Sequence, residues 1–496
     1  MNVQRTTTQV LIVGAGLVGL STAIALRTHG VQVLVLERHS GTSIQPKARR
    51  FNFRTMEVFR SYGIAAAVAD AARGLADFQG MHAGPTLAQS ERLPVPPSID
   101  FGSLAGISPE ESCLVAQDVL EPVLLDLARA RGAHVEFDTE AVAIASDPDG
   151  ISVTTNTGDV IRAAYVVAAD GSRSTLRDLL GIGRSGSGVS NRAVTVYFDA
   201  DLTAIVRGRE FNLCQIEQAF APGVFASIDG VRRWLFYTGE LLPVDAPADE
   251  WAARLRSAIG VDDVDIRVRS VAAWEPAMLV ADRFTAGRVL LAGDAAHVMP
   301  PYAALGANTG IQDAANLAWK LAYVLRGAAG PALLETYHEE RHAAGFYAAE
   351  QSTRRSGGLR EMSSMTDGLA HPFALVTGFR YESGALIDDG AGPQRMDRLE
   401  LTGRPGSRVP HVFLPDGRST LDVPGTGLAL LTGPDGGPWL AAAKSIGIES
   451  VEVANYCVDR GALLVRPDGI VAWHCPFLPD DPPATLAAAA STVLRT

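Results

Sequence analysis

The chain has 496 residues, of which 47% are hydrophobic, so it is long enough to form two or three domains with substantial cores. Its 43 basic and 55 acidic residues give a net charge of −12 without a basic block, which argues against a nucleic-acid partner. No apolar run approaches the roughly 18 residues of a membrane span. The four cysteines lack CxxC spacing, which argues against a bound metal. We therefore expect a cytoplasmic enzyme, and the sequence leaves homo-oligomer formation open.

The first elements predict a βαβ unit that binds a dinucleotide. A buried strand over 9–13, a helix over 17–29 and a strand over 31–36 follow one another in the order that such a unit requires. The GxGxxG motif at 14–19 joins the first strand to the helix, where glycines let the backbone approach a pyrophosphate at the helix N-terminus. Glu37 ends the second strand and can accept hydrogen bonds from an adenosine ribose. The alternative is a chance glycine turn, which the register of strand, helix and acid argues against.

The next elements extend this α/β unit. In chain order they are a mostly helical stretch over 54–73, an irregular or edge segment over 75–109, a helix over about 118–131, and strands over 134–145, 151–155 and 160–168. Asp118 and Glu121 have capping-box spacing, which predicts that Asp118 begins its helix. Asp170 follows the last strand, at a carboxyl end where open α/β sheets bind ligands. An aspartate that only caps the helix from Ser174 is an equally weighted alternative.

Alternating residues over 186–274 predict an antiparallel sheet, with one helix over about 249–259, inserted into the α/β unit. On one of its strands Trp234 and Phe236 share a face, and Tyr237 opposes them. Because a bound ring needs an apolar cover, we take these three aromatic residues as candidates for substrate binding. Packing in a core is the alternative for each of them.

A further buried strand over 288–292 leads to Gly293 and Asp294, whose carboxylate can hold a ribityl hydroxyl. The segment 306–309 then begins a helix over 308–326, and its N–H groups can stabilise the negative charge that a flavin gains on reduction. An ordinary capped helix is the alternative. A helix over 331–349, a linker and a βαβ-like unit over about 396–496 complete the chain.

Three motifs carry a resemblance to a known family. GAGLVG at 14–19, AADGSRSTLR at 168–177 and LLAGDAAHVMPPYAALGANTGIQDAANLAWKL at 290–321 together resemble the single-component flavin-dependent aromatic hydroxylases. That family includes para-hydroxybenzoate, phenol, dichlorophenol and aromatic polyketide hydroxylases. RTME at 54–57 matches its RTxE helix start, and RPDG at 466–469 is similar to the thioredoxin-like C-terminal domain of the phenol and polyketide hydroxylases. The loop before residue 306 carries alanine where the family usually carries glycine.

The resemblance implies an α/β fold with a Rossmann-like FAD-binding domain of the para-hydroxybenzoate hydroxylase type. An antiparallel-sheet substrate domain is inserted into it, and a thioredoxin-like domain without CxxC follows. The implied boundaries are 1–74, 110–185 and 275–355 for the FAD-binding domain, 75–109 and 186–274 for the substrate domain, 356–395 for a linker and 396–496 for the thioredoxin-like domain.

The resemblance also implies an FAD-dependent monooxygenase that uses NADPH or NADH and O2. In this family reduced flavin forms a C4a-hydroperoxide, which hydroxylates an electron-rich phenolic or polyketide-like ring. A flavin-dependent halogenase of the same fold is an alternative, but its WxWxIP signature is missing here. An FAD oxidase or reductase, or a flavoprotein that binds an aromatic ligand without turnover, are the others.

These motifs give two sets of candidates besides the three aromatic residues. Arg49, Pro301 and Gly306 are the candidates for catalysis, and Arg49 could pair with a phenolate or with the pyrophosphate. We expect His297 to be structural rather than a base. The cofactor-binding candidates, by motif or by resemblance, are Gly14, Gly16, Leu17, Val18, Glu37, Arg38, Lys47, Gln117, Asp170, Gly293, Asp294, Gly306, Ala307 and Asn308.

Overall fold

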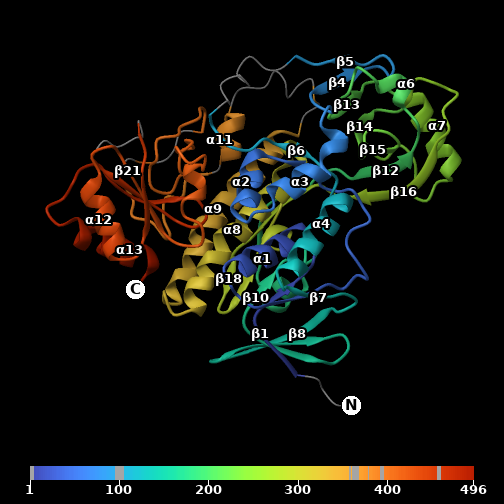
Figure 1. Cartoon of the computed structure of the whole chain (residues 1–496). Coiled ribbons are helices and arrows are strands. Elements are labelled where there is room, and N and C mark those ends of the chain that lie inside the picture. Colours follow the sequence, from blue (N-terminus) through green and yellow to red (C-terminus); the bar gives the residue numbers. More distant parts are fainter. Residues whose placement is uncertain are drawn as a thin grey trace.

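The computed structural model describes residues 5–94, 106–356, 359, 368–377, 379–390, 392, 396–454 and 460–496. Figure 1 shows three regions: helices around a central sheet, a mainly green sheet region at the upper right, and an orange-to-red C-terminal region at the left. Within those described ranges, no helix combines the length and the apolar character that crossing a membrane requires.

A mainly parallel sheet lies at the centre of the molecule. Its parallel strands have the order β19-β10-β1-β2-β7, and β18 and the β8–β9 hairpin add antiparallel strands on the β10 side. Val10, Leu11 and Ile12 pair with both β10 and β2 and are fully buried, as expected for a strand with both faces covered. The strands are β1 (Arg5–Val13), β2 (Val33–Leu36), β7 (His134–Glu136), β8 (Ala141–Asp147), β9 (Gly150–Thr155), β10 (Val160–Ala168), β18 (Thr285–Ala286) and β19 (Val289–Leu291).

Helices pack around this sheet and against one another. The first helix, α1, contacts α4 and α8, and α8 also contacts α2 and α9. The prediction that Asp118 begins α4 is wrong, because Ala116 is the N-cap and Gln117 the first helical residue. Asp118 lies inside the first turn and accepts a hydrogen bond from Arg233 at 2.7 Å. The helices are α1 (Leu17–Thr28), α2 (Phe53–Ser61), α3 (Ala65–Ala71), η1 (Arg73–Leu75), α4 (Gln117–Ala130), α5 (Thr175–Leu179), α8 (Leu305–Leu325) and α9 (Ala332–Arg354).

The antiparallel sheet predicted in the insertion is present, with strand order β16-β12-β15-β14-β13-β4-β5. Only β4 and β13 pair in parallel, which joins the earlier segment of the chain to the sheet. Helix α7 packs against this sheet and ends at Gly260, whose φ of 81° is a left-handed conformation that glycine adopts readily. The elements are β4 (Met81–Gly84), β5 (Glu91–Arg92), β12 (Ala193–Asp199), α6 (Thr203–Val206), β13 (Leu213–Ile216), β14 (Gly223–Ser227), β15 (Arg233–Thr238), α7 (Ala248–Ile259) and β16 (Arg267–Trp274).

Short strands and turns lie between the central and inserted sheets. The order β11-β17-β20 forms one small sheet, and β3 pairs with β6 in another. The turn η3 follows β19, and η4 directly precedes α8, so the motifs at 293–294 and 306–309 both lie at element boundaries. These elements are β3 (Arg50–Phe51), β6 (Cys113–Leu114), β11 (Arg184–Val189), β17 (Ala277–Ala281), η3 (Gly293–Ala295), β20 (His297–Val298) and η4 (Tyr302–Ala304).

The C-terminal region contains a sheet with order β22-β21-β23-β24. Strands β21 and β22 are parallel and joined by α12, which makes a βαβ unit with a second strand other than the predicted one. The predicted strand over 462–466 is β23, which pairs antiparallel with β21, and β24 pairs antiparallel with β23. Periodicity in the sequence did not separate β22 or α13. Cys457 lies outside the described residues. The elements are α11 (Pro372–Thr377), η5 (Thr420–Asp422), β21 (Ala429–Thr432), α12 (Gly437–Ser445), β22 (Glu449–Glu452), β23 (Ala462–Val465), β24 (Val471–Cys475) and α13 (Pro482–Leu494).

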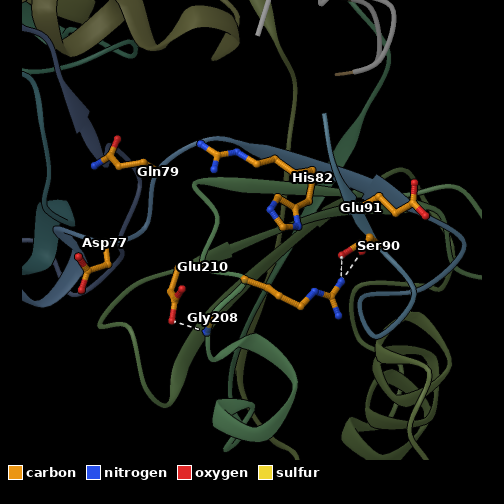
Figure 2. A pocket seen from close by; sticks show the side chains of 9 residues that line it. Asp77, Gln79, His82, Ser90, Glu91, Gly208 and Glu210 are labelled. Carbon is orange, nitrogen blue, oxygen red and sulfur yellow. Dashed lines mark hydrogen bonds between the residues drawn. The ribbon is translucent and has the colours of Figure 1, made fainter. Parts of the chain in front are cut away.

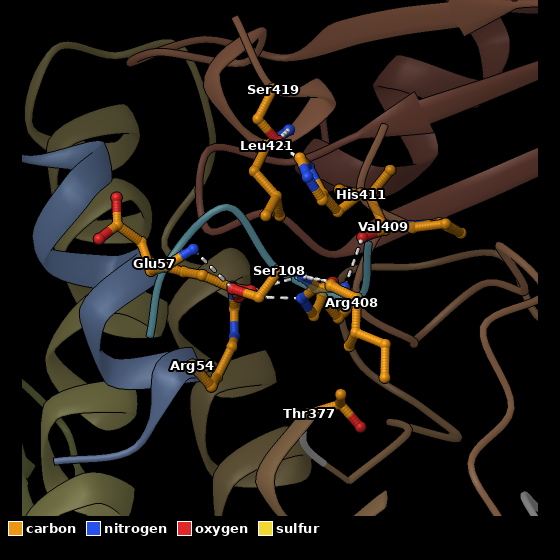
Figure 3. A network of polar contacts seen from close by, with 12 residues as sticks. Arg54, Glu57, Ser108, Thr377, Arg408, Val409, His411, Ser419 and Leu421 are labelled. Carbon is orange, nitrogen blue, oxygen red and sulfur yellow. Dashed lines mark hydrogen bonds and ion pairs between the residues drawn. The ribbon is translucent and has the colours of Figure 1, made fainter. Parts of the chain in front are cut away.

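A buried ionic network joins the C-terminal region to α2 (Figure 3). Arg408 binds the carboxylate of Glu57, and Arg54 binds the same carboxylate at 3.1 Å. Arg54 also donates to the backbone oxygen of Asp468 at 2.7 Å. Burial alone would raise the pKa of Glu57, but the two guanidinium groups lower it overall. The RTxE motif therefore serves the contact between regions.

A second network and a shared apolar core join the same region to α8 and α9. Glu340 of α9 accepts hydrogen bonds from Arg466 at 2.8 and 2.9 Å, and the ammonium nitrogen of Lys320 lies 3.0 Å from the same carboxylate. Trp319 and Tyr323 of α8 belong to one core cluster with residues of β21, β23, α12 and α13. The C-terminal region is thus fixed to the helices that flank the predicted flavin motifs.

Candidate functional site

The glycine motif lies in a tight turn between β1 and α1. Gly14 has a φ of 106°, and a Cβ there would lie 2.2 Å from the backbone oxygen of Ala169. A Cβ on Gly19 would lie 1.8 Å from the backbone oxygen of Gly14, so both positions exclude a side chain. Gly16 differs, because the nearest atom to its Cβ position is an oxygen of Glu121 at 3.6 Å. The motif therefore leaves space beside the N-terminus of α1.

Glu37 folds back onto this turn. One carboxylate oxygen accepts a hydrogen bond from the N–H of Ala15 at 2.8 Å, and the other accepts from the N–H of His39 at 2.9 Å. The side chain remains partly accessible, so it can also accept from a ribose hydroxyl. Arg38 and Lys47, two other candidates, are exposed.

Glu121 is a site residue whose role was not recognised from the sequence. This α4 carboxylate is 1% exposed and accepts hydrogen bonds from the amide of Gln117 and from the N–H of Ser43, both at 2.7 Å. Gln117 in turn accepts from the N–H of Ala48 at 3.1 Å. Burial raises the pKa of Glu121. The i,i+4 spacing of Gln117 and Glu121 was the signal that could have placed them together on one helix face.

Gly293 and Asp294 form the turn that follows β19. The N–H of Gly293 donates to Asp313 at 3.0 Å, and His297 and Arg341 hold that same carboxylate at 2.6 and 2.7 Å. His297 is fully buried, which agrees with a structural role. The side chain of Asp294 is exposed, although the protein around it reduces its hydration and raises the pKa of its carboxyl.

Asp170 combines the two roles considered for it. One carboxylate oxygen accepts from the N–H of Leu176 at 3.1 Å, so it helps to cap α5, and Ser174 caps the same helix. The other oxygen is buried without a hydrogen-bond partner among the described residues. A buried polar atom of this kind is normally paired, so a ligand hydroxyl would satisfy it.

The N-terminus of α8 also leaves room for a ligand. Gly306 is its second residue, and a Cβ there would meet only Met299 at 3.7 Å. The amide of Asn308 is instead occupied by protein: its oxygen accepts from Thr55 at 2.6 Å, and its nitrogen donates to Ala304 at 2.6 Å. The side chain of Asn308 is therefore engaged by protein, which leaves its backbone N–H as the group that could meet a ligand. Ala307 is half-buried and Pro301 is exposed.

Arg49 lies at the junction of β3 with the inserted sheet. Its guanidinium donates to the backbone oxygen of Ser227 at 2.7 Å and to the side chain of Asn212 at 2.6 Å. Burial lowers the pKa of Arg49 to about 10, while the nearby Tyr237 raises it. These hydrogen bonds hold the guanidinium against the inserted sheet. The geometry therefore disfavours a contact between Arg49 and the pyrophosphate.

The aromatic candidates separate onto the two faces of β15, as alternation requires. Trp234 and Phe236 are each 1% exposed and belong to the core that α7 covers. The indole nitrogen of Trp234 donates to the backbone oxygen of Ala200 at 3.1 Å, and Phe236 packs on Phe225 with a centroid distance of 4.6 Å. This packing favours the core alternative for both residues over substrate binding, because the more apolar face of the strand is the one that packs under α7. Tyr237 lies on the other face, near Arg49.

A separate polar cavity lies at the β4–β5 edge of the inserted sheet (Figure 2). Its volume is about 500 Å³. His82 faces into it with its ring against Phe211, and Arg209 donates to the backbone oxygen of Ala88. None of the candidate residues from the sequence lines this cavity, so it is distinct from the predicted flavin site.

The residues at the two helix N-termini fit FAD. A Cβ at Gly16 or Gly306 would meet no protein atom closer than 3.6 Å. Asp170 keeps one oxygen without a hydrogen-bond partner among the described residues, and the carboxylate of Asp294 is accessible, so these positions could receive the pyrophosphate, the flavin ring and the ribityl chain. Two protein-family models match this chain and agree with that fit. The FAD binding domain matches residues 7–352, and the C-terminal domain of aromatic-ring hydroxylases matches residues 402–496. The chain belongs to the FAD-dependent aromatic-ring hydroxylases.

Known members of the family resemble this hydroxylase over nearly its whole length. Tetracenomycin B2 monooxygenase-dioxygenase of Streptomyces olivaceus is 38% identical, with 98% of each chain covered. The 4-methyl-5-nitrocatechol 5-monooxygenase of a Burkholderia species is 36% identical, with 98% of this chain and 97% of that protein covered. A solved ternary complex of aklavinone-11 hydroxylase with FAD and aklavinone has a TM-score of 0.88 and 31% identity, with 99% of each chain covered. The predicted fold class, FAD cofactor and monooxygenase activity are confirmed.

Proposed function

We propose that this hydroxylase transfers one oxygen atom from O2 to an electron-rich phenolic ring of a polycyclic, polyketide-like substrate, with NADPH or NADH as the reductant. The names of its relatives support the substrate class, because they include monooxygenases of tetracenomycins and hydroxylases of aklavinone. The observation that carries the proposal is the pair of Arg49, which is buried, and Tyr237, which is half-buried beside it on the inserted sheet.

The chain's own residues would bind and orient FAD. The N-terminus of α1 would hold the pyrophosphate and Glu37 the adenosine ribose, while Asp170 and Asp294 would accept from ribityl hydroxyls. The N-terminus of α8, at Gly306, would stabilise negative charge at the pyrimidine edge. When bound, FAD supplies two-electron reduction and activation of oxygen.

Arg49 and Tyr237 would orient the phenol and favour its ionised form. A guanidinium near the ring stabilises a phenolate, the form that donates electrons best. Burial raises the pKa of Tyr237, so its hydroxyl stays protonated and can donate a hydrogen bond to the phenolate oxygen. The inserted sheet above this pair would exclude water from the reacting ring.

The decisive experiment is a panel of simple phenols and polyketide aromatics, assayed for ligand-stimulated NADPH oxidation with products identified by mass. We expect a polycyclic phenol to stimulate oxidation and to gain one oxygen atom. Binding without NADPH oxidation would favour the non-catalytic alternative, and hydrogen peroxide as the only product with every ligand would favour an oxidase.

A matched pair of variants tests the site. Tyr237→Phe should lower kcat/KM for the phenol by about tenfold, because one hydrogen bond to a charged oxygen is lost. Tyr197→Phe is the control, since its hydroxyl lies on the same sheet and contacts Arg233 at 3.3 Å. Equal activity of both variants would remove Tyr237 from the site.

A further inference from the structure

The loop that leads into α8 has an unusual backbone. Ala303 and Ala304 are consecutive residues with φ angles of 60° and 54°. In L-residues this left-handed conformation brings Cβ too close to the following carbonyl oxygen, and proteins normally place glycine there. Alanine stands at both positions in this chain. Such a conformation persists only where the surrounding structure holds it.

Two buried side chains hold this loop. The hydroxyl oxygen of Ser352, near the end of α9, lies 2.6 Å from the backbone oxygen of Pro300 and 2.8 Å from that of Tyr302. Ser352 is 0% exposed, so its hydroxyl is shielded from water. Asn308 donates to the backbone oxygen of Ala304 at 2.6 Å. The loop is thus tied on both sides of the two alanines.

Helix α9 is a fixed support for the serine. Arg341 binds Asp313, which in turn holds the turn at Gly293, and Glu340 binds Arg466 of the C-terminal region. Ser352 lies further along the same helix. One helix therefore connects three features: the turn before Asp294, the C-terminal region and the loop before α8.

We propose that Ser352 is a positioning residue that keeps Ala303 and Ala304 left-handed and so aims the first N–H groups of α8 at the flavin. The inference rests on the proposed function in one respect, namely that this loop faces the flavin. Ser352 would not touch the cofactor. Without its hydroxyl the loop would relax, and the N-terminus of α8 would move away from the pyrimidine edge.

The first test is Ser352→Ala. We expect the Kd for FAD to rise roughly three- to tenfold, because the loop loses the single buried hydroxyl donor that its backbone oxygens share. The reduction potential of the bound flavin should become more negative, because fewer N–H groups face the reduced ring. The control is Thr336→Val, which also deletes a buried hydroxyl from α9, but one that donates to Leu333 of its own helix. Thr336→Val should leave the potential unchanged.

The second test is rescue by glycine. Glycine adopts the left-handed conformation without strain, so Ala303→Gly with Ala304→Gly should restore the FAD affinity and potential of Ser352→Ala to within about twofold. In the wild-type background the same glycines should change either property by less than about twofold. A general loss of stability would not be repaired at these two positions.

The possible results distinguish a failure of the positioning role of Ser352 from a failure of the proposed FAD-dependent function. Wild-type protein that binds no FAD would overturn both. If the wild-type protein binds FAD but Ser352→Ala has the same FAD affinity and reduction potential as Thr336→Val, the positioning role alone is overturned. Failure of the glycine rescue would have the same consequence. Should Ser352→Ala not fold, Ser352→Thr keeps the hydroxyl, and it should show the wild-type potential.

Discussion

At the scale of single residues, the room for a Cβ at each motif glycine separates the glycines that the fold requires from those that could face a ligand. Gly14 and Gly19 exclude any side chain, because a Cβ at either position would lie 2.2 Å or less from a backbone oxygen, whereas a Cβ at Gly16 or Gly306 would meet protein only at ordinary contact distances of 3.6 and 3.7 Å. The first pair makes the turn possible, and the second pair leaves room for a ligand. The same reasoning separates Asp170 and Asp294, which keep a free oxygen or an accessible carboxylate, from Asn308, which is fully engaged by the protein.

Asp294→Ala should release most of the FAD. A ribityl hydroxyl would lose a charged acceptor, which costs roughly 1.5–3 kcal/mol, or about 10- to 100-fold in Kd. The flavin-to-protein ratio after gel filtration measures the effect. Asp249→Ala, at an exposed position in the first turn of α7, is the control and should keep its flavin. Full flavin loading of Asp294→Ala would remove this carboxylate from the cofactor site.

Trp234→Ala should reduce stability rather than alter substrate selection. The ring is 1% exposed in the core under α7, so its removal leaves a cavity that costs about 3–5 kcal/mol. Chemical denaturation measures the loss, and the coupling of NADPH oxidation to product should stay at the wild-type level in the folded fraction. Increased peroxide release from folded, fully loaded Trp234→Ala would instead place the residue at the substrate.

At the scale of elements, periodicity predicted the longer helices and most strands of the central sheet, but it did not predict short strands such as β4, β13 and β14 or every assignment of function. Alternation placed Trp234 and Phe236 opposite Tyr237, which is correct. Alternation could not show which face of β15 packs against α7. A covering helix and a bound cofactor both present apolar surface to a sheet, so the sequence pattern is the same for either. The capping-box spacing at Asp118 misled because the helix begins one residue earlier, at Gln117, and Asp118 lies inside its first turn. Its carboxylate binds Arg233, which is distant in sequence.

Gly306→Val tests the helix N-terminus as an element. Protein atoms leave space for a side chain there, with only Met299 at 3.7 Å, so the cofactor-free variant should keep its unfolding midpoint within a few degrees. The valine would occupy space that the flavin needs, so FAD affinity should fall or the reduction potential should become more negative. Spectroelectrochemical titration measures the potential. An unchanged affinity and potential would place Gly306 away from the ring.

At the scale of the whole molecule, the C-terminal region completes the fold and carries no dithiol pair among its described residues. Its RPDG motif and the RTxE motif of α2 meet across the boundary, and Trp319 of α8 is buried in the shared core. From the sequence both motifs could be recognised by resemblance, but their contact could not be inferred, because 414 positions separate Arg54 from Asp468.

Cys457→Ser combined with Cys475→Ser should therefore retain hydroxylation. Cys475 is buried and its sulfur approaches the backbone oxygen of Phe477, which serine can also contact. Product formation per NADPH consumed is the measurement, and we expect less than a twofold change. Loss of turnover in a variant that still binds FAD would assign redox chemistry to this region.

The buried charges at Glu340 yield the last prediction. Removing Arg466 as Arg466→Met leaves a buried carboxylate without its bidentate partner and should cost about 3–5 kcal/mol of unfolding free energy.

Lys320→Met should cost far less or stabilise the protein, because burial outweighs Glu340 and lowers the pKa of Lys320 from 10.5 to about 8. Between these two values the unfolded chain holds a proton that the folded protein has released, so the free energy of unfolding should rise with pH. Below about pH 8 Lys320 is protonated in both the folded and the unfolded state, so the full cost of burying its charge lowers the free energy of unfolding. Denaturation of wild type and Lys320→Met from pH 7 to 10 measures this difference, and parallel pH profiles would contradict it.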